Sequence, residues 1–288
     1  MPSERGRNPK RRREPRRRNS TEQGFDGLGG GQVEGRRAVR ELLAVGRRQV
    51  RHLWVADGLP ASSQLDEIEA LARRRHVRVE TVPRARIVAH ARTEAPQGVV
   101  AEANPIVPVA LEDLCSSRGD EDAFLLVVSG VTDPHNLGSL LRSAECAGVT
   151  GVVLARHRSA HLSPTVAKAA AGALEHLDFS VVGGIPNALT TLSSLGVTTV
   201  GLAGESPESI YETALAAGPV ALVVGGEERG IPPLARRRCD YLLSIPQHGS
   251  LPSLNVAVAG AIGCFEIARR RVSSTNAGPK SAVPSAAS

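Results

Sequence analysis

The sequence predicts an α/β protein whose C-terminal half folds around a mostly parallel β-sheet, preceded by a smaller α/β domain and a basic tail. The chain has 288 residues, enough for about two domains that each bury a core. From residue 124 onward, short and continuously apolar runs alternate with helical patterns, which is typical of parallel strands covered on both faces. Basic side chains are concentrated in the first 18 residues, before either domain begins.

The predicted basic tail and linker cover residues 1–32. Residues 1–18 carry nine Lys and Arg side chains and two glutamates, a net charge of +7, whereas the whole chain carries +6, so residues 19–288 together carry −1. Because the tail has almost no apolar side chains to offset its ordering entropy, we expect it to be disordered. Two interpretations remain open, an electrostatic tether for RNA phosphates and a solvated tail without a partner.

A small α/β domain is predicted over residues 33–104. Val39, Leu42 and Leu43 lie at helical spacing, and strand and helix patterns alternate after them. The expected helices cover residues 36–46, 62–75 and 84–91, and the expected strands cover residues 50–55, 77–82 and 98–103. Asn-Pro, Val-Pro and Ser-Ser sequences then predict a linker over residues 105–122.

The larger domain is predicted over residues 123–272, followed by a disordered Ser-, Ala- and Pro-rich tail over residues 273–288. Its expected strands cover residues 124–128, 151–155, 197–202, 220–224 and 241–245, and its expected helices cover residues 138–147, 164–173, 207–216, 232–238 and 253–271. The last helix carries small residues, among them Gly260 and Ala261, which predict close approach by another helix or by a second subunit.

Several protein classes are disfavoured by composition. No apolar run approaches the ~20 residues of a membrane span, and no apolar signal region follows the charged start, so we expect neither a membrane nor a secreted protein. The four cysteines lie far apart without a C-x-x-C pair, which argues against a disulfide framework or a zinc site and fits the cytoplasm. The seven Phe, Trp and Tyr residues form no cluster for base stacking, so any RNA contact should use phosphates, shape and a small pocket.

Three segments follow predicted strands, where α/β sheets place ligand sites. The first contains Asp133-Pro134 at a turn, then Asn136, and Arg142 within the expected helix. The first amide groups of that helix could hold an anion that Arg142 also reaches. Taken alone, this segment is explained better as an ordinary helix start with a solvated arginine.

The second and third segments contain Gly225-Gly226-Glu227 and Ser253-Leu254-Asn255. Adjacent glycines after a strand permit close approach by a ligand or form a tight turn. Ser253 is a good N-cap for the last helix, which would be its structural role. Asn255 lies in the first turn of that expected helix and is a poor helix former, so it is the more suggestive residue of the two.

Taken together and in this order, the three segments resemble the SpoU/TrmH branch of the SPOUT methyltransferases. The matching patterns are Asn136-x-Gly138-x-x-x-Arg142, Gly225-x-Glu227-x-x-Gly230-Ile231 and Ser253-Leu254-Asn255-Val256. Residues 158–173 resemble the ribosomal-RNA guanosine 2′-O-methyltransferases of this branch, and residues 35–100 resemble their N-terminal RNA-binding domain of the L30e type. Pro96 and Gln247 stand where relatives usually have His and Met.

The resemblance implies a fold and a site that local patterns do not give. It implies a deep C-terminal trefoil knot that binds S-adenosylmethionine, no metal, and a homodimer that acts on ribosomal RNA. The implied cofactor-binding residues are Leu202, Gly204, Gly225, Ile245 and Leu254. The implied catalytic and substrate-placing residues are Asn136, Arg142, Glu227, Ser253 and Asn255.

In the family, the arginine at the position of Arg142 is assigned the removal of the ribose proton. A guanidinium is hardly ever deprotonated in proteins, so we interpret Arg142 as a group that stabilises phosphate and alkoxide charge and relays a proton. The leading hypothesis is 2′-O-methylation of a guanosine in large-subunit (23S) ribosomal RNA. The alternatives are methylation of transfer RNA or of another ribosomal site, and a non-catalytic RNA-binding protein of ribosome assembly.

Overall fold

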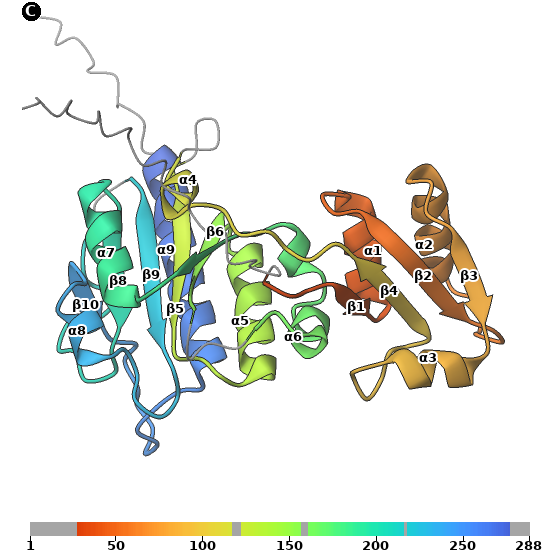
Figure 1. Ribbon diagram of the computed structural model, residues 1–288. Coiled ribbons are helices and arrows are strands. Elements are labelled where there is room, and N and C mark those ends of the chain that lie inside the picture. The colour runs from red at the N-terminus through yellow and green to blue at the C-terminus, as the bar shows by residue number, and fades with distance from the viewer. Residues whose placement is uncertain (1–27, 117–121, 157–160, 216–217, 277–288) are drawn as a thin grey trace, which may run out of the picture.

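The computed structural model describes residues 28–116, 122–156, 161–215 and 218–276, which form two lobes joined by two extended connections (Figure 1). The predictions for the basic tail up to residue 27 and for the C-terminal residues after 276 fall outside the described residues. Within the described part, a larger lobe contains the C-terminal sheet and a smaller lobe contains a second sheet.

The larger sheet has six strands in the order β10-β8-β9-β5-β6-β7, and every pair of neighbours is parallel. This confirms the predicted α/β fold with its parallel sheet. Phe124–Ser129 at the centre pairs on both sides, and all six of its residues are buried. The strands are β5 (Phe124–Ser129), β6 (Gly151–Ala155), β7 (Asp178–Val182), β8 (Thr198–Leu202), β9 (Val220–Gly225) and β10 (Tyr241–Leu243).

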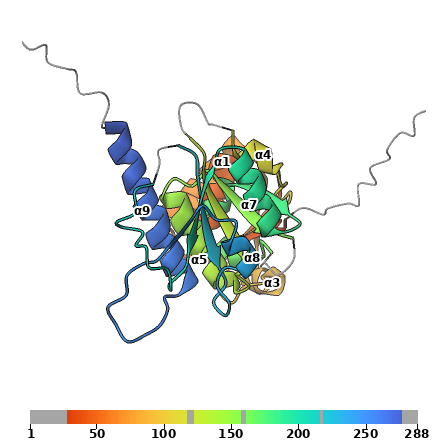
Figure 2. The same cartoon turned by 90° about the vertical axis from the view of Figure 1, so that its left-hand side faces the viewer.

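Helices cover both faces of this sheet. Alternate residues of each strand point to opposite faces, and apolar side chains on both faces pack against helices. Leu126 and Val128 pack with one group of helices, and Leu125 and Val127 pack with the other. Figure 2 shows α9 and α7 on opposite sides of the lobe. The first group is α5 (Pro134–Cys146), α6 (Pro164–Ala169) and α9 (Val256–Asn276), with the short 3-10 helix η1 (Ala173–Glu175), and the second is α4 (Leu111–Leu114), α7 (Ile185–Ser194) and α8 (Pro233–Arg236).

The smaller lobe is a mixed four-stranded sheet in the order β1-β4-β2-β3. Helices α1 and α2 pack on one face around Leu42 and Ile68, and α3 packs on the other face beside Trp54. The elements are β1 (Gln32–Glu34), α1 (Arg36–Val45), β2 (Val50–Ala56), α2 (Ser63–Arg74), β3 (Val79–Val82), α3 (Arg84–His90) and β4 (Val99–Ala103). The three predicted helices and three predicted strands are found here, and the three-residue β1 is additional.

In the larger lobe, one predicted helix is wrong, and one strand and two α-helices were not predicted. The described part of the expected helix at 207–216 forms turns, because its polar groups have other partners. The backbone N–H of Ile210 donates to the carbonyl of Ser244 at 2.9 Å, and the Ser209 hydroxyl accepts from the N–H of Tyr211 at 3.1 Å. The elements missing from the prediction are β7, α7 and the short α4, which lies in the stretch predicted as a linker and buries Leu111 and Leu114. Helix α7 contains four Ser and Thr residues, which are weak helix formers.

The small residues of α9 pack inside the same chain. A Cβ atom at Gly260 would lie 2.3 Å from Leu140 Cδ1 on α5, and one at Gly263 would lie 2.9 Å from Leu222 Cδ2 on β9. The sequence left two possible partners for these small residues, another helix or a second subunit. At Gly260 the partner is another helix of the same chain, α5. Only glycine leaves room for that contact.

Both connections between the lobes are anchored in the larger one. Leu28 and Ile106 are buried in the same hydrophobic core as Phe124, and the N–H of Leu28 donates to the carbonyl of Ile106 at 3.0 Å. The N–H of Gly30 donates to the carbonyl of Leu162 at 2.6 Å. The stretch predicted as a flexible linker is therefore packed from residue 28 onward, because its few apolar side chains have a core to enter.

A buried ion pair fixes the lobes beside these connections. Arg48 Nε donates to Glu175 Oε2 at 2.9 Å, and Arg48 Nη2 pairs with Glu175 Oε1. The side chains of Arg48 and Glu175 are only 9% and 4% exposed. Arg48 Nη1 also donates to the carbonyls of Gly30 at 2.8 Å and Asn104 at 2.9 Å. One guanidinium thus joins both connections to the larger lobe.

Replacing one partner of this pair should destabilise the protein strongly. In Glu175→Leu, the Arg48 charge stays buried without its counter-ion, which costs about 3–5 kcal/mol in comparable pairs. The double variant Arg48→Met/Glu175→Leu should recover part of that loss, because it removes both charges. Urea unfolding measures the free energy. Arg40→Met, which removes two more exposed pairs, with Glu41 and Glu67, is the control and should change little. Equal losses in Glu175→Leu and the control would contradict the assignment.

Candidate functional site

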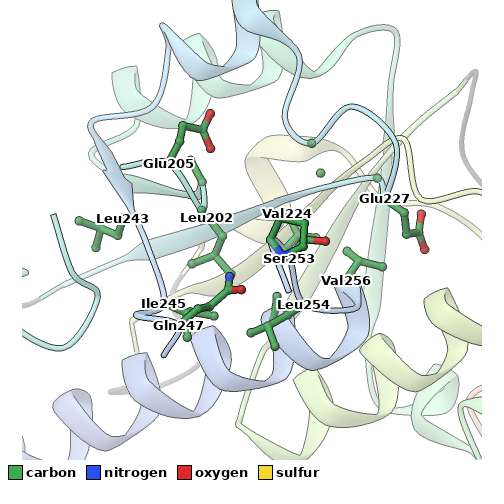
Figure 3. A pocket seen from close by; sticks show the side chains of 17 residues that line it. Leu202, Glu205, Val224, Glu227, Leu243, Ile245, Gln247, Ser253, Leu254 and Val256 are labelled. Carbon is green, nitrogen blue, oxygen red and sulfur yellow. The ribbon is translucent and has the colours of Figure 1, made fainter. Parts of the chain in front are cut away.

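A cavity of about 410 Å³ opens where β8, β9 and β10 end (Figure 3). Parallel strands place their carboxyl ends at one edge of the sheet, and the segments that follow them form the walls. These segments begin at Ala203, Gly226 and Ser244, and the chain before α9 closes the cavity with Ser253 and Leu254. Its volume falls within the range of small-molecule sites.

All the residues that the resemblance implied for cofactor binding line this cavity, namely Leu202, Gly204, Gly225, Ile245 and Leu254. They come from four segments that are up to 52 positions apart in the sequence, and the fold brings them together. Leu202 and Ile245 are partly buried and pack against the main core, so they give the cavity apolar walls. Their role toward a ligand stays a prediction.

The glycines of the cavity serve different purposes. A Cβ atom at Gly225 would lie 2.0 Å from the backbone of Gly230, and one at Gly226 would lie 2.1 Å from the Gly130 carbonyl oxygen. These two glycines are therefore required by the close packing of the chain's own loops. At Gly204 the nearest atom to a Cβ is Gln247 Nε2 at 4.0 Å, so the backbone there faces open space.

Three of the predicted catalytic side chains form a hydrogen-bonded row beside the cavity. Asn136 Nδ2 donates to Glu227 Oε1 at 2.5 Å, and Asn255 Nδ2 donates to Asn136 Oδ1 at 2.9 Å. Asn136 is placed by the start of α5, where the Asp133 carboxylate accepts from its backbone N–H at 2.7 Å. This helix begins at Pro134, four residues earlier than predicted, because Asp133 caps it. Of the three, Glu227 lines the cavity.

Asn255 has a structural role that its sequence position did not suggest. Its Oδ1 accepts from the N–H of Ala257 at 2.9 Å and of Val258 at 3.4 Å, and its carbonyl accepts from Ala259 at 2.9 Å. Asn255 is therefore the N-cap of α9, which begins at Val256. The interpretation of Ser253 as the cap is wrong, because residues 253–255 stay outside the helix and expose Ser253 at the cavity.

Arg142 lies apart from the other predicted residues. It is exposed on α5 and does not line the cavity, and its side chain has no hydrogen bond or ion pair with another described residue. Asn136 and Arg142 are six positions apart, about 240° around a helix at about 100° per residue, so they point to different sides of α5. Within one chain, the structure does not bring Arg142 to the cavity.

Two polar side chains of the cavity were not among the predicted site residues. Gln247 and Glu205 both line it, and Figure 3 shows Glu205 and Glu227 on opposite sides. The pKa of the Glu205 carboxyl is lowered, first by a hydrogen bond from the backbone of Glu205 itself and then by the Arg236 guanidinium. Its position directly after Gly204, at the carboxyl end of β8, was the available signal.

In the part of the chain that the structure describes, no group of three or more His, Cys, Asp or Glu side chains lies close enough to hold a metal ion. No helix among these residues has both the length and the apolar character needed to cross a membrane.

The N-cap assignment makes a direct prediction. Asn255→Ala should lower the free energy of unfolding by about 1 kcal/mol, because two amide groups of α9 lose their acceptor. Ser253→Ala is the matched control two residues away and should leave stability unchanged. Urea unfolding of both variants measures the difference. A loss in Ser253→Ala as large as that in Asn255→Ala would restore Ser253 as the cap.

Comparison with known protein families gives two matches. Residues 123–265 match the model of the SpoU rRNA Methylase family. Residues 32–108 match the model described as RNA 2′-O ribose methyltransferase substrate binding. The two matches cover the larger and the smaller lobe in turn.

Similar proteins agree with this result. The chain is 37% identical over 242 residues to the 23S rRNA (guanosine-2′-O-)-methyltransferase RlmB of Pseudomonas putida, covering 83% of this chain and 96% of that protein. It is 39% identical over 245 residues to RlmB of Pseudomonas aeruginosa, again covering 83% and 96%. The solved structure of the SpoU methyltransferase AviRb from Streptomyces viridochromogenes in complex with AdoMet matches with a TM-score of 0.69 and 27% identity, over 84% of this chain and 90% of that one. The chain belongs to the SpoU rRNA Methylase family.

Proposed function

We propose that this protein transfers a methyl group from S-adenosylmethionine to the ribose 2′-oxygen of a guanosine in 23S ribosomal RNA. The observation that carries the proposal is the match to RlmB proteins along 96% of their length, which includes the substrate-binding region as well as the SpoU domain. A ribosomal substrate is consistent with the expected cytoplasmic location.

The cavity fits S-adenosylmethionine in its chemistry. When bound, this molecule supplies a methyl group on a cationic sulfonium. Leu202, Ile245 and Leu254 offer apolar contacts, and the open backbone at Gly204 and the loop at Gly225 offer polar groups without side chains in the way. These five residues are the proposed binding set, and in the structure of AviRb with AdoMet a related fold holds the same molecule.

The chain's own groups would orient the ribose and exclude water, since proximity supplies much of the acceleration in such transfers. The Glu227–Asn136–Asn255 row holds three segments in fixed positions and presents the Glu227 carboxylate to the cavity. The exposed Ser253 hydroxyl stands beside it as a hydrogen-bonding group for the ribose. Asn136 and Asn255 then act as positioning residues.

Arg142 requires a second subunit in this proposal. Val258, Phe265 and Val272 are 48%, 51% and 62% exposed and lie seven positions apart, so they form one apolar stripe along α9. Helix α5, which carries Arg142, packs beside α9. A homodimer that buries this stripe would bring Arg142 of one subunit toward the cavity of the other, where a guanidinium stabilises the developing alkoxide charge.

A trefoil knot is part of the proposal and rests on the path of the chain. From β9 the chain crosses β8 to form β10 at the edge of the sheet, and then returns to place α9 against α5 and β9. The segment between β10 and α9 lines the cavity. A knot would hold that segment in place without further contacts.

The alternatives are weaker. Methylation of transfer RNA or of another ribosomal site would use the same cavity, but the RlmB relatives favour 23S rRNA. A non-catalytic RNA-binding protein would not require Asn136, Glu227 and Asn255 to be joined beside a ligand-sized cavity.

Mapping of 2′-O-methyl groups on all stable RNAs, with and without this protein, tests the function. Loss of one methyl group from a 23S guanosine is the expected result. Purified Arg142→Ala should lose about 100-fold or more in transfer rate, because a charge-stabilising group is removed. Its S-adenosylmethionine affinity and melting temperature should stay near those of the parent. Arg237→Ala, an exposed arginine on the same lobe, is the control. Full turnover in Arg142→Ala would overturn its role.

The proposed dimer is tested at Phe265. Phe265→Glu places a charge in the apolar stripe and should give folded monomers without activity, since the wild-type interface should bury more than ~1,000 Å². Leu234→Glu changes a similarly exposed side chain on α8 and should leave the dimer intact. Sedimentation at micromolar concentration separates the two forms. A wild-type chain that is monomeric and fully active would refute the dimer.

A further inference from the structure

A second cavity, of about 460 Å³, lies where the two lobes meet. The smaller lobe contributes Arg51, Arg92 and Glu102 to its walls, and the larger lobe contributes His161 and Ser163. The glycine-rich connection at residues 29–31 forms part of its lining, so backbone rather than side chains borders the space there. We call this cavity the interdomain cleft.

The charges of the interdomain cleft favour an anion. Two guanidinium groups and one imidazole face a single carboxylate, that of Glu102. Neither Arg51 nor Arg92 forms an ion pair with a carboxylate among the described residues. Arg51 Nε donates to Asn104 Oδ1 at 2.8 Å, which fixes the side chain and leaves the terminal nitrogens of its guanidinium for another partner.

A buried carboxylate holds Arg92 in place. Glu34 is fully buried, and it accepts from the N–H of Arg92 at 2.7 Å, from the N–H of Thr93 at 3.2 Å and from Gln32 Nε2 at 2.8 Å. Burying a carboxylate is costly unless it is hydrogen-bonded, and here three of its four donors belong to Arg92 and Thr93: their two N–H groups and the Thr93 hydroxyl. Lys168 of α6 reaches the same loop, with its Nζ 3.4 Å from Thr93 Oγ1. The backbone position of Arg92 is therefore fixed by the fold.

The two sides of the interdomain cleft are held in register by the ion pair of the lobe junction. Gly30 lines the cleft, and its carbonyl accepts from Arg48, which is paired with Glu175. Its N–H donates to Leu162, which lines the cleft from the larger lobe. The cleft thus exists before any ligand binds.

The interdomain cleft also lies toward the edge of the sheet that holds the candidate site. His161 and Ser163 follow β6, as Gly226 and Glu227 follow β9, and both strands flank β5 in the parallel sheet. Two strand spacings separate β6 from β9, about 10 Å. The larger-lobe wall of the cleft and the loop at Glu227 therefore leave the sheet at the same edge.

We propose that the interdomain cleft binds the phosphodiester backbone of the RNA substrate, next to the nucleotide that is methylated, with Arg51 and Arg92 as phosphate contacts. This inference rests on the proposed function, because it takes RNA as the ligand. Arg51 and Arg92 can contact phosphate groups, and the glycine backbone at residues 29–31 lets an RNA strand approach the cleft closely. Phosphate contacts of this kind position RNA without reading its sequence.

The double variant Arg51→Gln/Arg92→Gln tests the proposal in the full-length protein. Binding to deproteinised 23S rRNA is measured from 50 to 300 mM KCl, a titration range chosen around physiological salt. Affinity should fall about tenfold, and the slope of log K against log salt should shallow by about 1.4–1.8, for two phosphate contacts. The KM for RNA should rise, while kcat and S-adenosylmethionine affinity stay unchanged.

Arg73→Gln/Arg74→Gln is the matched control. It removes the same charge from α2, on the far side of the smaller lobe (Figure 1), and should keep the parental slope. Arg51→Lys/Arg92→Lys keeps the charge and should retain most of the slope, provided that the melting temperature is unchanged. Equal effects in the Gln double variant and the α2 control, or no effect in either, would overturn the proposal. In a third outcome, the wild type and the Gln double variant differ in RNA affinity and salt slope as predicted while the wild type transfers no methyl group. That result would refute the proposed function and leave the RNA-binding proposal standing.

Discussion

The parallel arrangement of the larger sheet determines where everything else in this lobe lies. Because all six strands run in one direction, each connection crosses back over a face of the sheet, and each strand ends at the same edge. The segments after β8, β9 and β10 therefore meet around one cavity, and the segment after β6 reaches the interdomain cleft close by. The cavity and the larger-lobe wall of the interdomain cleft are therefore formed by segments that leave the sheet at one edge.

The sequence predicted the parallel sheet well because its central strands are apolar on both faces, as Phe124–Ser129 shows. It failed where a strand or helix depends on partners far away. Asp178–Val182 lies at an edge of the sheet, and residues 207–215 bond to the end of β10 instead of forming a helix. Helix ends were also displaced, because Asp133 and Asn255 act as caps through side-chain contacts that propensity alone does not contain.

The candidate site was predictable only through its motifs. Local patterns favoured ordinary explanations for Arg142 and for Ser253, and the order of three motifs made the site visible. Even so, the motifs did not distinguish Asn255 as a helix cap from Asn255 as a substrate contact, and the geometry shows that one amide side chain joins α9 to Asn136. Glu205 lies outside the quoted motifs, and its position directly after Gly204 was the only sequence signal for a side chain that lines the cavity.

The burial of Leu28 and Ile106 changes how the folding of this chain should be viewed. Both side chains belong to the core that contains Phe124, so that core is discontinuous in sequence and the smaller lobe is an insertion between two of its pieces. During synthesis, Leu28 is made about a hundred residues before Phe124, the first strand residue of this core, so it stays without its core partners until then. The larger lobe can complete its core only after the inserted lobe has brought residues 28 and 106 side by side, which couples the folding of the two lobes.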